Sequence, residues 1–164
     1  TTAPGGQTYL PAGIDQRLQL DLAGLPLHKN VIVSFELYVI GNWPGNNPGG
    51  LPAEWTFGPV GQAALLDTTF SNDPTVLQAY PRPLGLGSYP GRTGAEGLDE
   101  LGYEGTPDAR YAMRYKYSPT AEDLHLLFRS LNLPDGALWG LDNIVIRVDN
   151  GYTQIYMPII HTQQ

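Results

Sequence analysis

The chain has 164 residues, of which 41% are hydrophobic and 15% are charged, and its formal net charge is −7. This composition excludes a disordered acidic tail and a coiled coil, and the acidic balance argues against nucleic acid and anionic membrane surfaces as partners. The absence of cysteine excludes disulfides, thiol catalysis and cysteine-ligated metals. No apolar run reaches the roughly 18 residues of a membrane span.

Glycine and proline divide the chain into short segments. Twenty Gly and fifteen Pro separate runs rich in Val, Ile, Tyr and Thr, a pattern that predicts an all-β protein with many turns. We expect the polar residues 1–13 to form an exposed extended arm. Residues 14–164 should form a single β-sandwich domain that includes an apolar C-terminal strand.

Alternation of apolar and polar residues marks the predicted strands. Val31–Ile40 is the strongest, because both of its faces are largely apolar, so it should be central and covered on both sides. The aromatic face of 110–117 should pack inward. The other predicted strands are 14–22, 54–57, 63–70, 124–130, 144–148 and 152–160, the last of them an edge strand because it contains a proline.

These strands predict two antiparallel sheets packed face to face, in a sandwich of the jelly-roll type. The residues expected between the sheets are the large apolar ones on the inner faces: Phe35, Leu37, Tyr115, Phe128, Trp139, Ile144 and Ile146. The irregular segment 73–107 is either a binding surface or a cover over one end of the sandwich.

Two turns are predicted near the end of the chain. Trp139-Gly140-Leu141-Asp142-Asn143 has the composition of a turn with an aromatic anchor, and we expect it to lock the last core strand in place. Its carboxylate and amide oxygens could also face a cation, although a structural turn is the favoured interpretation. Asp149-Asn150-Gly151 predicts a tight hairpin.

Several of these stretches resemble a domain found in secreted bacterial proteins. The resemblance implies a galactose-binding-like or concanavalin-like jelly roll of extracellular and surface-anchored proteins. It says more about fold and export than about a ligand. The residues that carry it are Val31–Ile40, Trp43, Glu54–Phe57, Thr69–Asn72, Tyr80-Pro81 and above all Trp139–Ile144.

A calcium site is one hypothesis for the acidic residues near strand ends. Calcium takes several oxygen ligands from carboxylates, amides and carbonyls, and the candidates are Glu36, Glu54, Asp142 and Asn143. Glu36 lies in the central strand, where a carboxylate needs a partner. That partner could instead be an ion pair or a hydrogen bond with a neighbouring strand.

Loop aromatics suggest a second kind of site. Exposed rings in loops stack on sugar faces or fill protein pockets, and the candidates, which we expect to be exposed, are Trp43, Tyr80, Tyr89 and Tyr103. The alternative is that each ring plugs the end of the sandwich.

Enzymatic signatures are weak. The histidines His28, His125 and His161 lack metal-ligand spacing, and no Gly-x-Ser-x-Gly elbow is present. A glycoside hydrolase needs two facing carboxylates, and the only candidates lie in the loop segment Asp99–Glu104. We therefore expect a non-enzymatic protein.

The two ends of the chain favour a structural role. A polar N-terminal arm and an apolar strand-like tail suit strand donation between copies, which predicts a structural or adhesive protein that self-associates into a fibre or surface layer. The alternative is a glycan-binding module, with calcium as its cofactor. Thr1–Gly6 would suit a mature N-terminus left by a signal peptide, so we expect an extracellular or cell-surface location.

Overall fold

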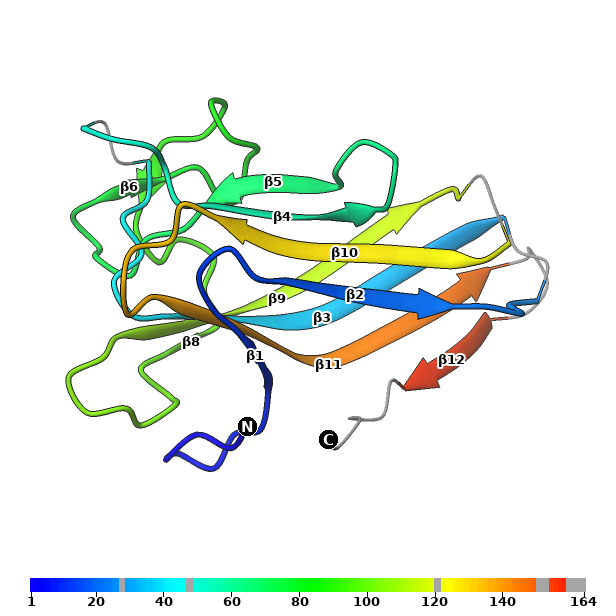
Figure 1. Cartoon of the computed structure of the whole chain (residues 1–164), viewed down its shortest axis with the longest axis horizontal. Helices are drawn as coiled ribbons and strands as arrows, with labels where there is room; N and C mark the ends of the chain where they lie inside the picture. The colour runs from blue at the N-terminus through cyan, green and yellow to red at the C-terminus, as the bar shows by residue number, and fades with distance from the viewer. Residues whose placement is uncertain (27–28, 47–48, 120–121, 150–153, 159–164) are drawn as a thin grey trace.

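The computed structural model describes residues 1–26, 29–46, 49–119, 122–149 and 154–158. It confirms the predicted all-β fold: two antiparallel sheets pack against each other as a β-sandwich (Figure 1). The jelly-roll type of its connections stays a prediction. No helix in the described part of the chain is long and apolar enough to cross a membrane.

The larger sheet is built around three long strands. In order across the sheet they are β11 (Leu138–Asp149), β3 (Asn30–Ile40) and β9 (Asp108–Tyr117). Short strands complete its two ends. β1 (Leu10–Ala12) and β12 (Gln154–Pro158) both pair with β11, and β8 (Gly97–Leu98) pairs with β9.

The second sheet has four strands, in the order β2 (Arg17–Leu22), β10 (Leu124–Leu131), β4 (Glu54–Pro59) and β5 (Leu66–Thr69). A separate hairpin pairs β6 (Leu77–Gln78) with β7 (Tyr89–Pro90). The long connections that carry β6, β7 and β8 gather at one end of the sandwich (Figure 1).

The alternating pattern of Val31–Ile40 determines the core. β3 pairs with β11 along one edge and with β9 along the other, as its two apolar faces predict. Its odd-numbered residues from Val31 to Val39 point between the sheets and are at most 2% exposed. There the ring of Phe35 lies 5.0 Å from that of Phe57 and 5.3 Å from that of Phe128.

The predicted core residues lie in this layer. Phe35, Leu37, Phe128, Trp139 and Ile146 are buried, and Tyr115 and Ile144 are partly buried and pack against them.

The predicted turn at Trp139–Asn143 is wrong. Trp139–Asp142 are strand residues paired with Val39–Glu36, so β11 runs through the whole motif. The register shifts between Asp142 and Val145, and Asn143 there has a φ of 50°. A β-bulge places two residues opposite one, and Asn tolerates positive φ. The Asp and Asn therefore mark a bulge inside a strand.

The prediction of an exposed N-terminal arm holds only in part: most of residues 1–13 are exposed, but the segment is attached to the large sheet. Residues 10–12 form β1 in register with Leu141–Trp139, and Tyr9 is only 2% exposed. Tyr9 belongs to a second apolar cluster on the outer face of the large sheet, together with Ala3, Tyr38, Ile40 and Leu101. Composition missed this packing because the partners of the segment lie far away in the sequence.

Some predictions lie outside the described residues. They are the turn of Asp149-Asn150-Gly151, residues 159–160 of the apolar tail, and two histidines, His28 and His161. β11, which ends at Asp149, and β12, which begins at Gln154, pair antiparallel.

Candidate functional site

Three of the four predicted calcium ligands come together on the outer face of the large sheet. Glu36 of β3 pairs directly with Asp142 of β11, and Asn143 follows at the bulge. Glu54 lies elsewhere, on β4 of the other sheet. The register between β3 and β11 therefore brings Glu36, Asp142 and Asn143 together, although they lie far apart in the sequence.

The carboxylate of Glu36 already has partners. One oxygen accepts a hydrogen bond from Nη1 of Arg110 at 2.9 Å, and the other accepts one from the side-chain amide of Asn143 at 2.8 Å. This matches the alternative expectation that Glu36 pairs with a neighbouring strand. Among the described residues, no group of three or more His, Cys, Asp or Glu could hold a metal ion. Calcium stays a prediction without geometric support here.

Arg110 is the hub of this cluster. Its guanidinium also contacts Glu100 at 3.0 Å and Glu96 at 3.8 Å, so three carboxylates surround one positive charge. The hydrogen bond that Arg110 donates to Glu100, together with the negative charges of Glu36 and Glu100, raises the pKa of Arg110. Burial, followed by the negative charges of Glu36 and Asp142, raises the pKa of the neighbouring Tyr38 to about 12. The cluster is thus an acidic corner neutralised in part by one arginine.

The loop aromatics do not form a shared exposed platform. The prediction that Trp43 is exposed is wrong: it is 0% exposed, and its indole N–H donates to the carbonyl of Leu138 at 2.9 Å. The loop folds inward because an indole gains more from the core than from water. Tyr80 is half-buried and packs on Phe70 and Tyr111.

The other two predicted aromatics are half-buried as well. Tyr103 packs against the outer apolar cluster, and its hydroxyl lies 2.9 Å from that of Tyr9. Tyr89 belongs to the small β6–β7 hairpin. Trp43, Tyr80 and Tyr103 therefore contribute to packing at one end of the sandwich.

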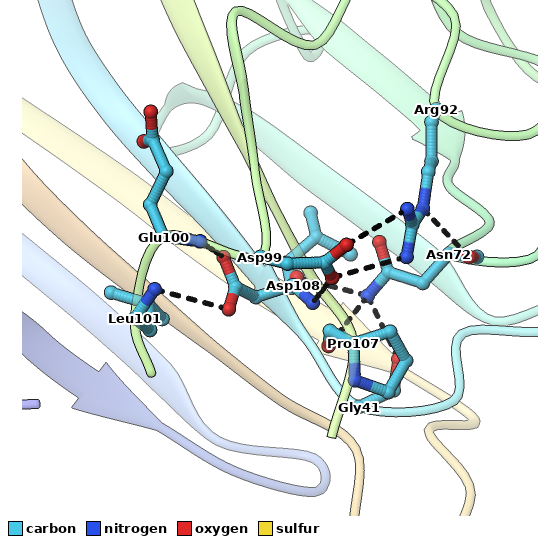
Figure 2. A network of polar contacts seen from close by, with 9 residues as sticks. Gly41, Asn72, Arg92, Asp99, Glu100, Leu101, Pro107 and Asp108 are labelled. Atoms are coloured by element: carbon cyan, nitrogen blue, oxygen red, sulfur yellow. Dashed lines mark hydrogen bonds and ion pairs between the residues drawn. The ribbon is translucent and has the colours of Figure 1, made fainter. Parts of the chain in front are cut away.

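Asp99, one of the loop acids of Asp99–Glu104, helps to hold the long connection in place (Figure 2). Asp99 pairs with Arg92 at 3.3 Å and accepts the backbone N–H of Asp108 at 3.2 Å. The carboxylate of Asp108 accepts the backbone N–H groups of Glu100 and Leu101 at 3.0 and 3.2 Å. Burial raises the pKa of Asp108, which these two hydrogen bonds oppose.

Asn72 completes that network from the other side. Its side-chain amide donates to the carbonyls of Gly41, Val39 and Pro107 at 2.8, 3.0 and 3.3 Å, and Arg92 donates to the carbonyl of Asn72 at 2.8 Å (Figure 2). Two of the candidate acids for glycoside hydrolysis, Asp99 and Glu100, therefore have structural partners.

The outer edge of β11 is the place where the two predicted assembly segments meet. β1 pairs with Trp139–Leu141, and β12 pairs with Val145–Asp149, so each short strand covers one part of the same edge (Figure 1). The bulge at Asn143 lies between them. This edge is our candidate site for association between copies.

The β1 part of this edge has side-chain anchors that local sequence patterns missed. The ring of Tyr9 lies so close over Gly140 that a Cβ at this position would be less than 3.0 Å from Cδ2 of Tyr9. A Gly inside a strand pattern signals such a close approach. Tyr9 also contacts the ring of Tyr38 at 5.5 Å.

Comparisons with protein-family models, curated proteins and solved structures found no match.

Proposed function

We propose that this protein is a non-enzymatic extracellular structural or adhesive protein whose copies associate by exchanging strand β12. The observation that carries the proposal is the pairing of β12: among the described strands it pairs with β11 alone, over Val145–Asp149. A strand held at the edge of a sheet by a single neighbour is the element most readily exchanged between copies.

Exchange preserves every backbone pair of the free subunit. The Gln154–Pro158 strand of one copy would occupy the register now used within the chain, so the exchanged state loses no hydrogen bond of the ladder. If each copy gives its strand to the next, the contact is head-to-tail and extends into a fibre unless it closes as a ring. Main-chain pairing of this kind is a common mode of strand addition.

The N-terminal segment is a poor donor by comparison. Its β1 strand pairs with β11 of its own chain, and Tyr9 beside it is buried under the outer apolar cluster. Releasing β1 would expose that ring to water. We therefore assign the exchange to β12 and keep the N-terminal segment as part of the subunit.

A cysteine pair across β11 and β12 tests the proposal. The chain has no cysteine, so Arg147→Cys with Tyr156→Cys introduces the sole thiols, at positions directly opposite each other in the ladder. Opposite residues in antiparallel strands have Cα atoms about 4.5–5.5 Å apart, which suits a disulfide. Arg147→Ser with Tyr156→Ser is the matched control.

The oligomeric state is measured after oxidation of the concentrated full-length protein. Exchange predicts disulfide-linked multimers on a non-reducing gel, together with fibres by electron microscopy and large species by light scattering. Multimers should disappear when the disulfide is formed first in dilute monomer. A wild-type chain that stays monomeric at high concentration would overturn the proposal, and so would fibres built from subunits whose disulfides are all internal.

A further inference from the structure

Two cations of strand β9 lie on the outer face of the large sheet. The odd-numbered residues of β3 point between the sheets, so its even-numbered residues face outward. The register sets Arg114 opposite Ser34, and it sets Lys116 opposite Ile32. Both cations are exposed, and no hydrogen bond or ion pair joins either side chain to another described residue.

Arg147 of β11 adds a third cation around the same part of β3. Ile32 pairs with Lys116 on one side and with Arg147 on the other. The backbones of these two cations therefore lie two strand spacings apart, or about 9–10 Å. Arg114 is two residues from Lys116, which is about 7 Å along a strand. Arg114, Lys116 and Arg147 form a triangle that we call the basic patch.

Acidic groups are few at this end of the sheet. Between the bulge of β11 and its last residue, and along the stretches of β3 and β9 paired with it, only Asp149 is acidic. Three cations and one carboxylate leave a net charge of +2 here, in a chain whose formal net charge is −7. At the other end of β9, by contrast, Arg110 is surrounded by three carboxylates, those of Glu36, Glu96 and Glu100.

The floor of the basic patch is aliphatic. Ile32 and Val145 face outward and are half-buried, and Ser34 beside Val145 adds a hydroxyl. No aromatic ring faces outward here among the described side chains, whereas proteins that bind single-stranded nucleic acid stack bases on such rings. Duplex DNA carries one charge per roughly 1.7 Å, so the net charge of −7 would repel it strongly. Basic clusters that hold anionic membranes have about four to eight cations.

We propose that the basic patch binds an anionic polysaccharide through its carboxylate or sulfate groups. This inference rests on the proposed adhesive role, for which it supplies the partner. A single exposed ion pair contributes little free energy, but a polymer that repeats its anion presents several at once. The C–H groups of the sugar rings then contact Ile32 and Val145 while the anions reach the three cations.

Titration of the full-length wild-type chain with purified polysaccharides tests the proposal. Polygalacturonate supplies carboxylates, dextran sulfate supplies sulfates, and dextran is the neutral control. We expect at least one polyanion to bind in isothermal titration calorimetry at low salt and to be released at high salt, while dextran does not bind. The polyanion that binds more tightly identifies the anion.

Matched removal of charge locates the site. Arg114→Gln with Lys116→Gln should weaken binding about tenfold or more, because two ion pairs are lost for each bound polymer segment. Arg17→Gln with Arg129→Gln makes the same change in net charge on two exposed, mutually paired residues of the other sheet and should leave the affinity nearly unchanged. Unchanged melting temperatures would show that both variants fold.

Three results would overturn the proposal. They are no binding of either polyanion, equal weakening by the two double variants, and equally tight binding of poly-glutamate, single-stranded DNA or phosphatidylserine vesicles. Positions 147 and 156 stay wild-type throughout, so the outcome is independent of the disulfide experiment on β12. Multimers without polysaccharide binding would overturn this inference alone, and binding by a chain that stays monomeric would overturn strand exchange alone.

Discussion

The outer edge of β11 carries two short strands that are held in different ways. β1 has three residues and β12 has five, and the shorter strand is anchored by a neighbouring side chain: Tyr9 lies over Gly140, contacts Tyr38 and reaches the hydroxyl of Tyr103. β12 is joined to β11 by its backbone ladder. The number of ladder pairs alone is therefore a poor guide to how firmly an edge strand is attached, because buried side chains contribute more free energy than most individual hydrogen bonds.

The largest effect should come from removing the anchor of β1. Tyr9→Ala deletes a ring that is 2% exposed and should lower the free energy of unfolding by about 3–5 kcal/mol. Chemical denaturation measures the loss, and hydrogen exchange should show faster exchange at Leu10–Ala12. A loss no larger than that caused by Tyr89→Ala, at a half-buried ring of the β6–β7 hairpin, would contradict the comparison.

Gly140, which lies under the ring of Tyr9, should be nearly as sensitive to substitution. Gly140→Ala places a Cβ less than 3.0 Å from Cδ2 of Tyr9, and the overpacking should cost roughly 1–3 kcal/mol. Gly13→Ala is the control, because its nearest neighbour is a side-chain atom of Leu138 at an ordinary 3.6 Å. In Tyr9→Ala protein the same Gly140→Ala change should cost much less, which a double-mutant cycle detects. Additive effects would argue against the contact.

A smaller effect is expected from the hydroxyl pair. Tyr103→Phe removes the partner of the Tyr9 hydroxyl at 2.9 Å and should cost about 1 kcal/mol of stability. Denaturation at neutral pH measures it. Because the ring of Tyr103 stays in place, a cost as large as that of Tyr9→Ala would mean that the hydroxyl pair is more important than packing.

The smallest effect is the dependence of stability on the ionisation of Tyr38, which is absent at neutral pH and appears only at alkaline pH. The pKa of Tyr38 is raised to about 12 from its ordinary value of 10.0, mainly by burial. A tyrosine with a raised pKa favours the folded state fully below pH 10, and this contribution is lost as pH rises from 10 towards 12. Stability should therefore fall across that window, with tyrosinate absorbance rising in step. Tyr38→Phe should flatten the fall, and an unchanged profile would contradict it.

Local pattern was enough to predict the centre of the molecule. Alternation in Val31–Ile40 and 110–117 identified β3 and β9, because a strand with one or two buried faces must repeat every two residues. The need of Glu36 for a partner was also clear from its place in a buried strand. Its actual partners, Arg110 and Asn143, depend on strand register, which the sequence alone does not reveal.

The wrong predictions fall where contacts with distant segments override the local conformational preference of the sequence. Gly140, Asp142 and Asn143 are turn-forming residues, yet pairing with β3 keeps them in a strand and places the irregularity at a bulge. Trp43 and Tyr9 lie in Gly- and Pro-rich stretches that look solvent-exposed, but both side chains reach apolar clusters formed by residues far away in the chain. No window of local sequence contains that information.

The bulge at Asn143 also protects the outer edge of β11 against aggregation. Long, flat, unbroken strand edges are templates for cross-β stacking and amyloid growth. On β11 the shift between Asp142 and Val145 separates the outer edge into one part that pairs with three residues and another that pairs with five. Both are shorter than the six or seven residues of a typical amyloid segment, and the local twist of a bulge turns them out of line with each other. An edge divided in this way can pair with a short strand in one register. It resists the open-ended stacking of strands by which amyloid grows.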